Sequence, residues 1–224
     1  MDGDLSGRLL RIYQTLLSAY GPQGWWPGES AFEVVLGAVL TQNTAWGNVE
    51  RALDNLKRVG VLSPSGLCGL GQEALEQLLR PAGTYRVKAA RVRALLDYLE
   101  RAHGGDLAGL AAGDLEAVRR ELLSVPGIGP ETADSILLYA AGRPTFVIDA
   151  YTRRFVGRLG LAGEQSPYEE LRALFMDHLP ADPALYNEYH ALIVRHGKER
   201  CRARQPRCSG CPVEPECSFG QVRT

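Results

Sequence analysis

The stretch SVPGIGPETADS, residues 124–135, holds two glycines one residue apart, followed by a proline and by residues that favour a helix. A helix is predicted to end near Ser124 and the next to begin at Pro130, where proline's missing N–H would have no helical partner anyway. Ile128, between the glycines, is expected to point inward between the two helices. The stretch therefore predicts a helix–hairpin–helix unit.

The hairpin glycines, Gly127 and Gly129, suggest a function as well as a turn. Glycine adopts positive φ readily and lets another molecule approach the backbone closely. N–H groups of the hairpin and of the following helix N-terminus can then point together at an anion. Phosphate contacts of this kind position a protein on a nucleic acid without reading its bases. A tight turn with no ligand is the alternative that the motif alone leaves open.

Outward from the hairpin, nearly every periodic segment has helical spacing, which predicts an all-α fold. Serine, threonine and aspartate stand where N-caps belong, at Ser30, Thr44, Asp114 and Asp149. The expected helices are Gly7–Ala19, Ala31–Leu40, Trp46–Val59, Gln72–Leu79, Lys88–Ala102, Asp114–Leu123, Pro130–Ala141, Ala150–Leu159, Tyr168–His178 and Pro183–His196.

The composition is that of an ordinary globular protein. The chain has 224 residues, 45% of them hydrophobic, and a formal net charge of −1. This length buries a substantial core, in one domain or two small ones. No apolar run reaches the roughly 20 residues that span a bilayer, and the N-terminus does not resemble a secretory signal. We therefore expect a cytoplasmic protein with no membrane partner.

Charge is concentrated near the C-terminus, where six basic residues between 195 and 207 face a single Glu199. A basic face on a neutral protein fits a nucleic-acid contact surface. A solvated charge run is the alternative.

Four of the five cysteines stand close together in CRARQPRCSGCPVEPEC. Their spacing is C-x6-C-x2-C-x5-C, at Cys201, Cys208, Cys211 and Cys217. Thiols this close in a cytosolic chain indicate metal rather than disulfides. Zinc and a [4Fe–4S] cluster both accept four thiolates, and the irregular spacing favours the cluster without excluding zinc. Cys68 is isolated and is expected to be a small buried side chain.

Asp149 follows the apolar run Phe146–Ile148 and precedes a predicted helix. It is expected to cap that helix. A carboxylate at the mouth of an apolar site can also activate water or stabilise a developing cation.

Together, the PGIG hairpin, Asp149 and the cysteine spacing resemble the endonuclease III branch of the helix–hairpin–helix DNA glycosylases, over nearly the whole chain. The resemblance implies two helical domains flanking a DNA-binding cleft. A six-helix barrel would span 33–142, with the hairpin unit at about 114–141. The second domain would combine 1–32 with 143–224 and carry a loop, 201–217, that binds a [4Fe–4S] cluster rather than zinc through the four cysteines.

Glu131 departs from this pattern. Bifunctional members of the family carry a lysine here, whose amine attacks the sugar and leads to strand cleavage. A carboxylate forms no Schiff base. The resemblance therefore implies a monofunctional glycosylase in which Asp149 supports hydrolysis and the abasic product stays uncut. The other role open to Glu131 is that of a first-turn acid stabilised by the helix dipole.

The tryptophans suggest the substrate. Trp25, Trp26 and Trp46 are the three in the chain. Indoles stack on flat rings and attract cationic ones, such as 3-methyladenine. The WWP…GAVLTQNT arrangement resembles the 3-methyladenine DNA glycosylase III subgroup, in which a lysine near the terminal segment can be functional; Lys198 is the candidate. Core packing is the alternative for the tryptophans.

Gln42 matches the family position whose side chain fills the gap left by a flipped base. The residues expected at the DNA are Gln42, Gly127, Ile128, Gly129, Thr132, Arg195, Arg202 and Arg204.

The sequence thus predicts a monomeric, nucleoid-associated glycosylase that acts on damaged double-stranded DNA. One alternative is an endonuclease III-type glycosylase with weak AP lyase activity on oxidised pyrimidines, its amine supplied by Lys198. Another is a non-catalytic protein that binds DNA damage.

Overall fold

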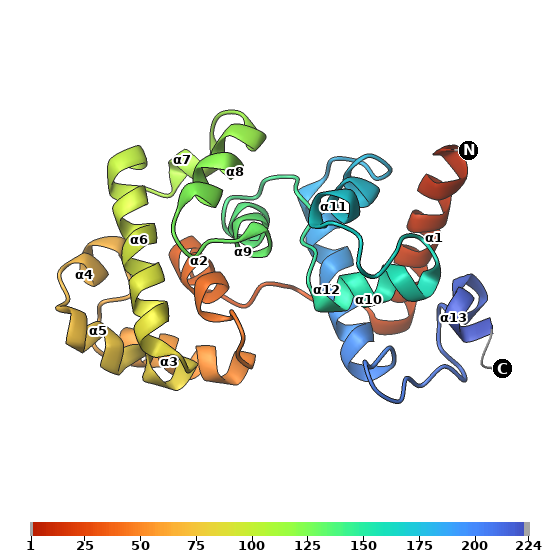
Figure 1. Cartoon of the computed structure of the whole chain (residues 1–224), viewed down its shortest axis with the longest axis horizontal. Helices are drawn as coiled ribbons and strands as arrows, with labels where there is room; N and C mark the ends of the chain where they lie inside the picture. The colour runs from red at the N-terminus through yellow and green to blue at the C-terminus, as the bar shows by residue number, and fades with distance from the viewer. Residues whose placement is uncertain (1, 222–224) are drawn as a thin grey trace. The chain divides into compact units, whose positions relative to one another are not determined.

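The computed structural model describes residues 2–221, and within that range the chain forms helices and no strand (Figure 1). The all-α prediction is confirmed. The chain divides into two compact units. Trp26–Arg143 form one, called here the central unit; the residues before Trp26 and after Arg143 form the other, called the terminal unit.

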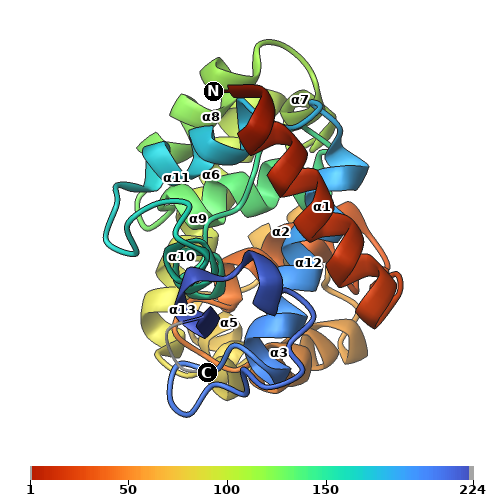
Figure 2. The ribbon, with the colours of Figure 1, turned by 90° about the vertical axis from the view of Figure 1, so that its right-hand side faces the viewer.

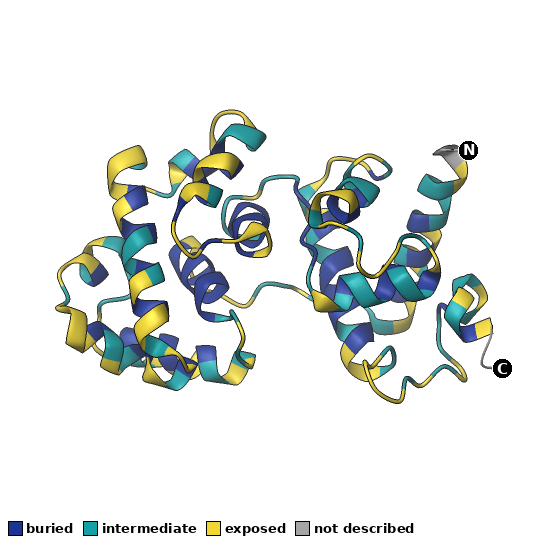
Figure 3. Cartoon of the chain, in the orientation of Figure 1, coloured by how far each residue is buried: buried dark blue, intermediate teal, exposed yellow. Residues whose placement is uncertain are grey.

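The central unit is built around α2, which is buried over nearly its whole length (Figure 3). Its sequence AFEVVLGAVL is apolar on all sides apart from Glu33, which is typical of a helix surrounded by others. Ser30 caps it by accepting a hydrogen bond from the N–H of Glu33. The elements of this unit are α2 (Ala31–Leu40), α3 (Trp46–Arg58), α4 (Pro64–Cys68), α5 (Gln72–Leu79), η1 (Arg80–Ala82), α6 (Tyr85–His103), α7 (Ala108–Ala111), α8 (Leu115–Ser124), α9 (Pro130–Ser135) and η2 (Ile136–Ala140).

The terminal unit is built around α12, which packs against both α1 and α10; Figure 2 shows α1 alongside α12. The buried Tyr189 hydroxyl donates to the Leu9 carbonyl at 3.0 Å and ties α12 to α1. A Cβ on Gly197 would lie 2.5 Å from the Tyr151 ring, so glycine allows α12 to approach α10. The elements are α1 (Asp2–Tyr20), α10 (Ala150–Leu159), α11 (Tyr168–Met176), α12 (Pro183–Glu199), η3 (Glu214–Glu216) and α13 (Ser218–Gln221).

Three of the expected helices, Ala31–Leu40, Gln72–Leu79 and Ala150–Leu159, have the predicted bounds. The short helices α4, α7 and α13 are additional, since one or two turns are too short to establish a period. The helix predicted over Pro130–Ala141 is α-helical only to Ser135 and continues as a π-helix through Ala140.

Two local predictions are wrong. Thr44 is not the cap of α3: Ala45 occupies that position without a side-chain bond, and the Thr44 hydroxyl instead accepts from the Asn48 amide. Cys68, the last residue of the short helix α4, is exposed rather than buried, and it is the neighbouring Leu67 that packs into the core. Within residues 2–221, no helix combines the length and the apolar content that crossing a membrane requires.

Candidate functional site

The hairpin between α8 and α9 has the predicted form. Gly127 has a φ of 86°, in the region that favours glycine. Gly129 is the N-cap of α9, and Pro130 lies in the first turn. Ile128 is 5% exposed and belongs to the core of the central unit, so it points inward as expected. A buried ion pair between Arg119 of α8 and Asp134 of α9, at 2.9 Å, holds the two helices together.

Gln42, which follows α2, lies on this hairpin. Its amide nitrogen donates to the Gly127 carbonyl at 3.1 Å and to the Thr132 hydroxyl at 2.8 Å. Its carbonyl oxygen accepts a hydrogen bond from the Arg91 guanidinium. The structure thus brings together three of the residues expected at the DNA. Arg91 was missed, because no local motif distinguishes it from the other basic residues of α6.

Replacing Gly127 with alanine is expected to lower the free energy of unfolding by about 2 kcal/mol, because a side chain is strained at this positive φ. The added Cβ would also lie 2.8 Å from Cδ of Arg91, which must then shift away from Gln42. The midpoint of urea denaturation should fall to a lower urea concentration, and the affinity for DNA should decrease.

Gly129→Ala is the matched control for that substitution. Gly129 has a φ of −92°, and a Cβ there meets nothing within 4 Å. Equal losses of stability in the two variants would contradict the role given to the Gly127 backbone.

Asp149 is the N-cap of α10. Its Oδ1 accepts from the Thr152 N–H at 2.7 Å, while its Oδ2 lies 3.6 Å from Nε2 of His190 on α12. Burial pushes the pKa of Asp149 upward, but the imidazole of His190 and the donors of Thr152 outweigh it and hold the pKa below its ordinary value. Asp149 is therefore ionised at neutral pH, and its side chain remains 16% exposed.

Glu131 lies in the first turn of α9 and is exposed. A carboxylate is favourable here because it faces the positive end of the helix dipole.

Two of the three tryptophans contact each other within the central unit. Within the central unit, the Trp26 ring packs edge-on against Trp46, with centroids 5.2 Å apart, and lies 5.0 Å from the ring of Tyr139. Gly37 of α2 lies against both indoles, since a Cβ there would be in ordinary van der Waals contact with them, at 3.4–3.5 Å. Tyr139, missed by the sequence analysis, sits on the π-helical turn, a feature frequent at functional sites.

Trp25 belongs to the terminal unit, where it meets Lys198. The Lys198 ammonium lies 5.9 Å from the Trp25 ring centroid, a cation–π distance. The loop after α1 is also fixed to α12 at a second place, because the Gln23 N–H donates to Glu188 at 2.7 Å. Two candidates far apart in the sequence are thus neighbours.

The predicted basic surface is only partly available. Arg195 donates to the Tyr20 carbonyl at 2.9 Å, lies over the Tyr20 ring and is bridged to Glu199, so it holds the loop after α1. Arg202 and Arg204 are exposed on the cysteine loop, and their contact with phosphate stays a prediction.

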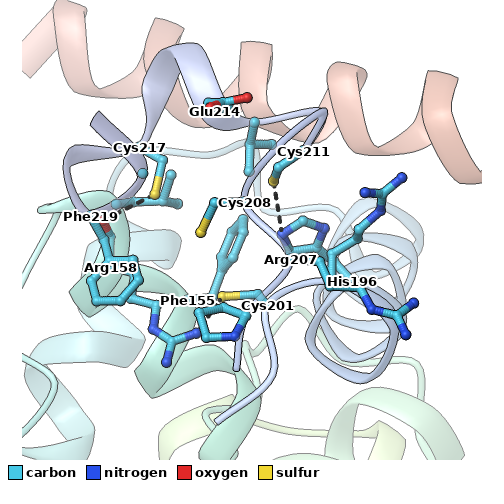
Figure 4. Close-up of a pocket in the computed structure, with 15 residues that line it drawn as sticks. Phe155, Arg158, His196, Cys201, Arg207, Cys208, Cys211, Glu214, Cys217 and Phe219 are labelled. Carbon is cyan, nitrogen blue, oxygen red and sulfur yellow. Dashed lines mark hydrogen bonds between the residues drawn. The ribbon is translucent and has the colours of Figure 1, made fainter. Parts of the chain in front are cut away.

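The four cysteines of the C-terminal loop line one pocket, together with apolar side chains such as Phe155, Leu159 and Val213 (Figure 4). Two nitrogen groups reach the thiols: the Arg158 guanidinium donates to the Cys201 sulfur at 3.2 Å, and Nε2 of His196 lies 3.7 Å from the Cys211 sulfur. Among the described residues, no three side chains of His, Cys, Asp or Glu are arranged to share one metal ion.

His196 is fixed by a second contact, 2.8 Å from its Nδ1 to the Tyr20 hydroxyl. Burial and the nearby Arg200 lower the pKa of His196 to about 4, so it is neutral at physiological pH. Burial also raises the pKa of the Cys211 thiol, and the three neighbouring cysteines raise it further.

Comparison with known proteins gives consistent matches. A family model described as "HhH-GPD superfamily base excision DNA repair protein" matches residues 36–181. A Methanocaldococcus jannaschii protein named as a DNA repair glycosylase is 45% identical over 93% of this chain and 95% of its own. Endonuclease III of Thermotoga maritima is 31% identical over 86% of this chain and 84% of its own.

Solved structures agree with the fold. Endonuclease III in a trapped covalent complex with DNA superposes with a TM-score of 0.82 at 23% identity, over 97% of this chain and 98% of that one. The 3-methyladenine DNA glycosylase of H. pylori, bound to 1,N6-ethenoadenine, superposes with a TM-score of 0.72 at 28% identity, over 85% of this chain and 97% of that one.

Proposed function

Since the chain belongs to the HhH-GPD superfamily of base excision DNA repair proteins, and so is a DNA glycosylase, we propose that it is monofunctional and releases alkylated purines such as 3-methyladenine. Two observations support this proposal: Asp149 is ionised, and a carboxylate, Glu131, stands at the position where the family's lyases have a lysine. The enzyme would leave an abasic site in an uncut strand and would act as a monomer.

The chemistry needs little more than Asp149. When the glycosidic bond breaks, positive charge develops on the sugar, and a fixed carboxylate stabilises that charge and directs a water molecule. A 3-alkylated purine already carries positive charge and leaves without strong acid catalysis. Glu131 cannot form a Schiff base with C1′, so the reaction would stop at hydrolysis.

Aromatic side chains support the preference for alkylated purines. Trp26, Trp46 and Tyr139 form one cluster, and Trp25 lies beside Lys198. A flat cationic base gains from stacking and cation–π contact with such rings. The likeness to the H. pylori 3-methyladenine glycosylase agrees with this substrate class.

DNA would be held by the hairpin and by the exposed arginines of the cysteine loop, Arg202 and Arg204. We assign Gln42 to the gap left by the flipped base. To enter it, the Gln42 amide must leave Gly127, Thr132 and Arg91, so insertion would exchange existing hydrogen bonds for new ones.

The cysteine pocket fits a [4Fe–4S] cluster. Its donor set is four thiols, Cys201, Cys208, Cys211 and Cys217, around a space with apolar walls, and N–H groups of Arg158 and His196 face the sulfurs. Such donors stabilise thiolate charge. A cluster there would supply four iron–thiolate bonds that hold the loop, which has little hydrophobic core of its own.

The decisive test is a panel of duplexes carrying 3-methyladenine or a stable analogue, thymine glycol, uracil or an abasic site, each assayed with and without hot alkali. We expect cleavage of the methylated-purine strand only after alkali, and no adduct on borohydride trapping.

Direct nicking with a borohydride-trapped adduct lost in Lys198→Ala would establish the lyase alternative instead. Lesion binding with no turnover on any duplex would establish the binding-only alternative.

A further inference from the structure

His190, which no motif in the sequence singled out, faces the candidate catalytic carboxylate. Its Nε2 lies 3.6 Å from Oδ2 of Asp149, and the residue is only 4% exposed. That separation is longer than a hydrogen bond but within the range of a strong electrostatic contact. Contacts of catalytic groups are often long in free enzymes and shorten when the substrate is bound.

The imidazole is held on its other side by the aromatic core of the terminal unit. The Phe146 ring meets it nearly edge-on, at 77° and 6.3 Å, and Phe146 in turn stacks on Phe175 at 3.8 Å. Phe146 begins the apolar run that ends at Asp149, so the same short segment packs against His190 and presents the carboxylate to it. A ring fixed in this way has little freedom to turn aside.

The two carboxylate oxygens of Asp149 have different partners. Oδ1 is engaged by the first turn of α10 through Thr152, and Oδ2 faces His190 of α12. From α11, the Tyr168 hydroxyl accepts the N–H of Ile148 at 3.3 Å and fixes the backbone just before Asp149. The polar groups that face the Asp149 carboxylate itself are therefore the Thr152 donors of α10 and the His190 imidazole of α12.

We propose that His190 is a positioning residue, whose Nε2–H fixes Oδ2 of Asp149 so that the carboxylate keeps its orientation and charge during base release. The proposal rests on the proposed function of Asp149. Preorganisation of this kind matters because a carboxylate that must turn, or be deprotonated first, stabilises less of the developing charge.

The electrostatic consequence has a definite sign. Asp149 has a lowered pKa, to which His190 contributes, so removal of His190 would raise it. Since the ionised carboxylate is the active form, the acidic limb of the rate profile would move to higher pH. His190→Leu is expected to shift this limb upward by about one pH unit. His190→Gln keeps an N–H near the place of Nε2 and would recover most of the shift.

The experiment measures single-turnover base release from pH 5 to 9 in the two variants, with Tm recorded for each. His178→Leu is the matched control, a histidine of the same unit whose ring lies against the Leu174 carbonyl. His190→Leu is also combined with Asp149→Asn in a double variant. If His190 acts through Asp149, His190→Leu should cause no further loss of rate in the Asp149→Asn variant, because the effects of two residues that act together do not add.

A carboxyl ¹³C NMR titration of Asp149 in the free protein gives a second readout that needs no substrate. An unmoved Asp149 titration in His190→Leu, or an equal rate loss with and without Asp149, would overturn the role of His190 alone. A fully active Asp149→Asn variant would instead overturn the proposed function of Asp149, whatever the NMR shows.

Discussion

Replacing Asp149 with asparagine is expected to reduce the release of 3-methyladenine by about 10³-fold, because it removes the charge that stabilises the sugar cation. Asparagine caps helices about as well as aspartate, so its side-chain oxygen can still accept from the Thr152 N–H. The substitution thus removes the charge and keeps the cap. Single-turnover kinetics with DNA in the saturating range would measure the effect.

Asp114→Asn is the matched control. Asp114 caps α8 in the same way, accepting from the Ala117 N–H at 2.8 Å, but lies in the central unit. Its rate of base release should stay within about twofold of the parent, since surface substitutions that keep a cap change little. Comparable rate losses in both variants would mean that the Asp149 effect comes from the helix cap and not from catalysis.

If the loop binds the proposed [4Fe–4S] cluster, Cys211→Ala is expected to prevent its assembly and to lower the free energy of unfolding by about 4 kcal/mol or more, since metal binding contributes folding energy to a loop with little core of its own. Alanine supplies no ligand and also removes the sulfur that faces His196. The purified variant should lack the brown colour and the broad absorption at about 400 nm that are typical of such clusters and are expected of the parent protein. Iron and sulfide analysis with thermal melts would measure both effects.

Cys68→Ala serves as the comparison for that variant. Cys68 is exposed and lies in the other unit, so its loss should change neither colour nor stability. Metal analysis that finds four iron atoms and no zinc per chain in the parent protein would support the cluster. A colourless parent containing one zinc would contradict it.

The hairpin, the cysteine pocket and the cap at Asp149 could all be predicted from the sequence, because each depends on spacing within a short segment. The glycine spacing determines a tight turn, and four cysteines within one short loop are held close together by the chain itself. The contacts of Arg91, Tyr139 and His190 could not be predicted in this way. Each of these side chains meets its partner only after helices distant in the sequence have packed, and no local period encodes that packing.

The tryptophans illustrate the same limit. Trp25, Trp26 and Trp46 were expected together as base-pocket residues, and the fold gives Trp25 and Trp26 different neighbours within different units, Lys198 for Trp25 and Trp46 with Tyr139 for Trp26. Adjacency in sequence is a weak guide where the chain passes from one compact unit to the next.

The discontinuous terminal unit has a consequence for how the protein is made. α1 precedes the central unit in the chain, but its apolar face of Leu9, Ile12 and Leu16 is buried in a unit that α12 completes, and Tyr189 of α12 lies 180 positions after its partner Leu9. The central unit is continuous in sequence and can fold during translation, before α12 has been made and can pack against α1. The hairpin can therefore fold early, whereas Asp149, His190 and the four cysteines of the C-terminal loop belong to a unit that is completed only after α12 has been made.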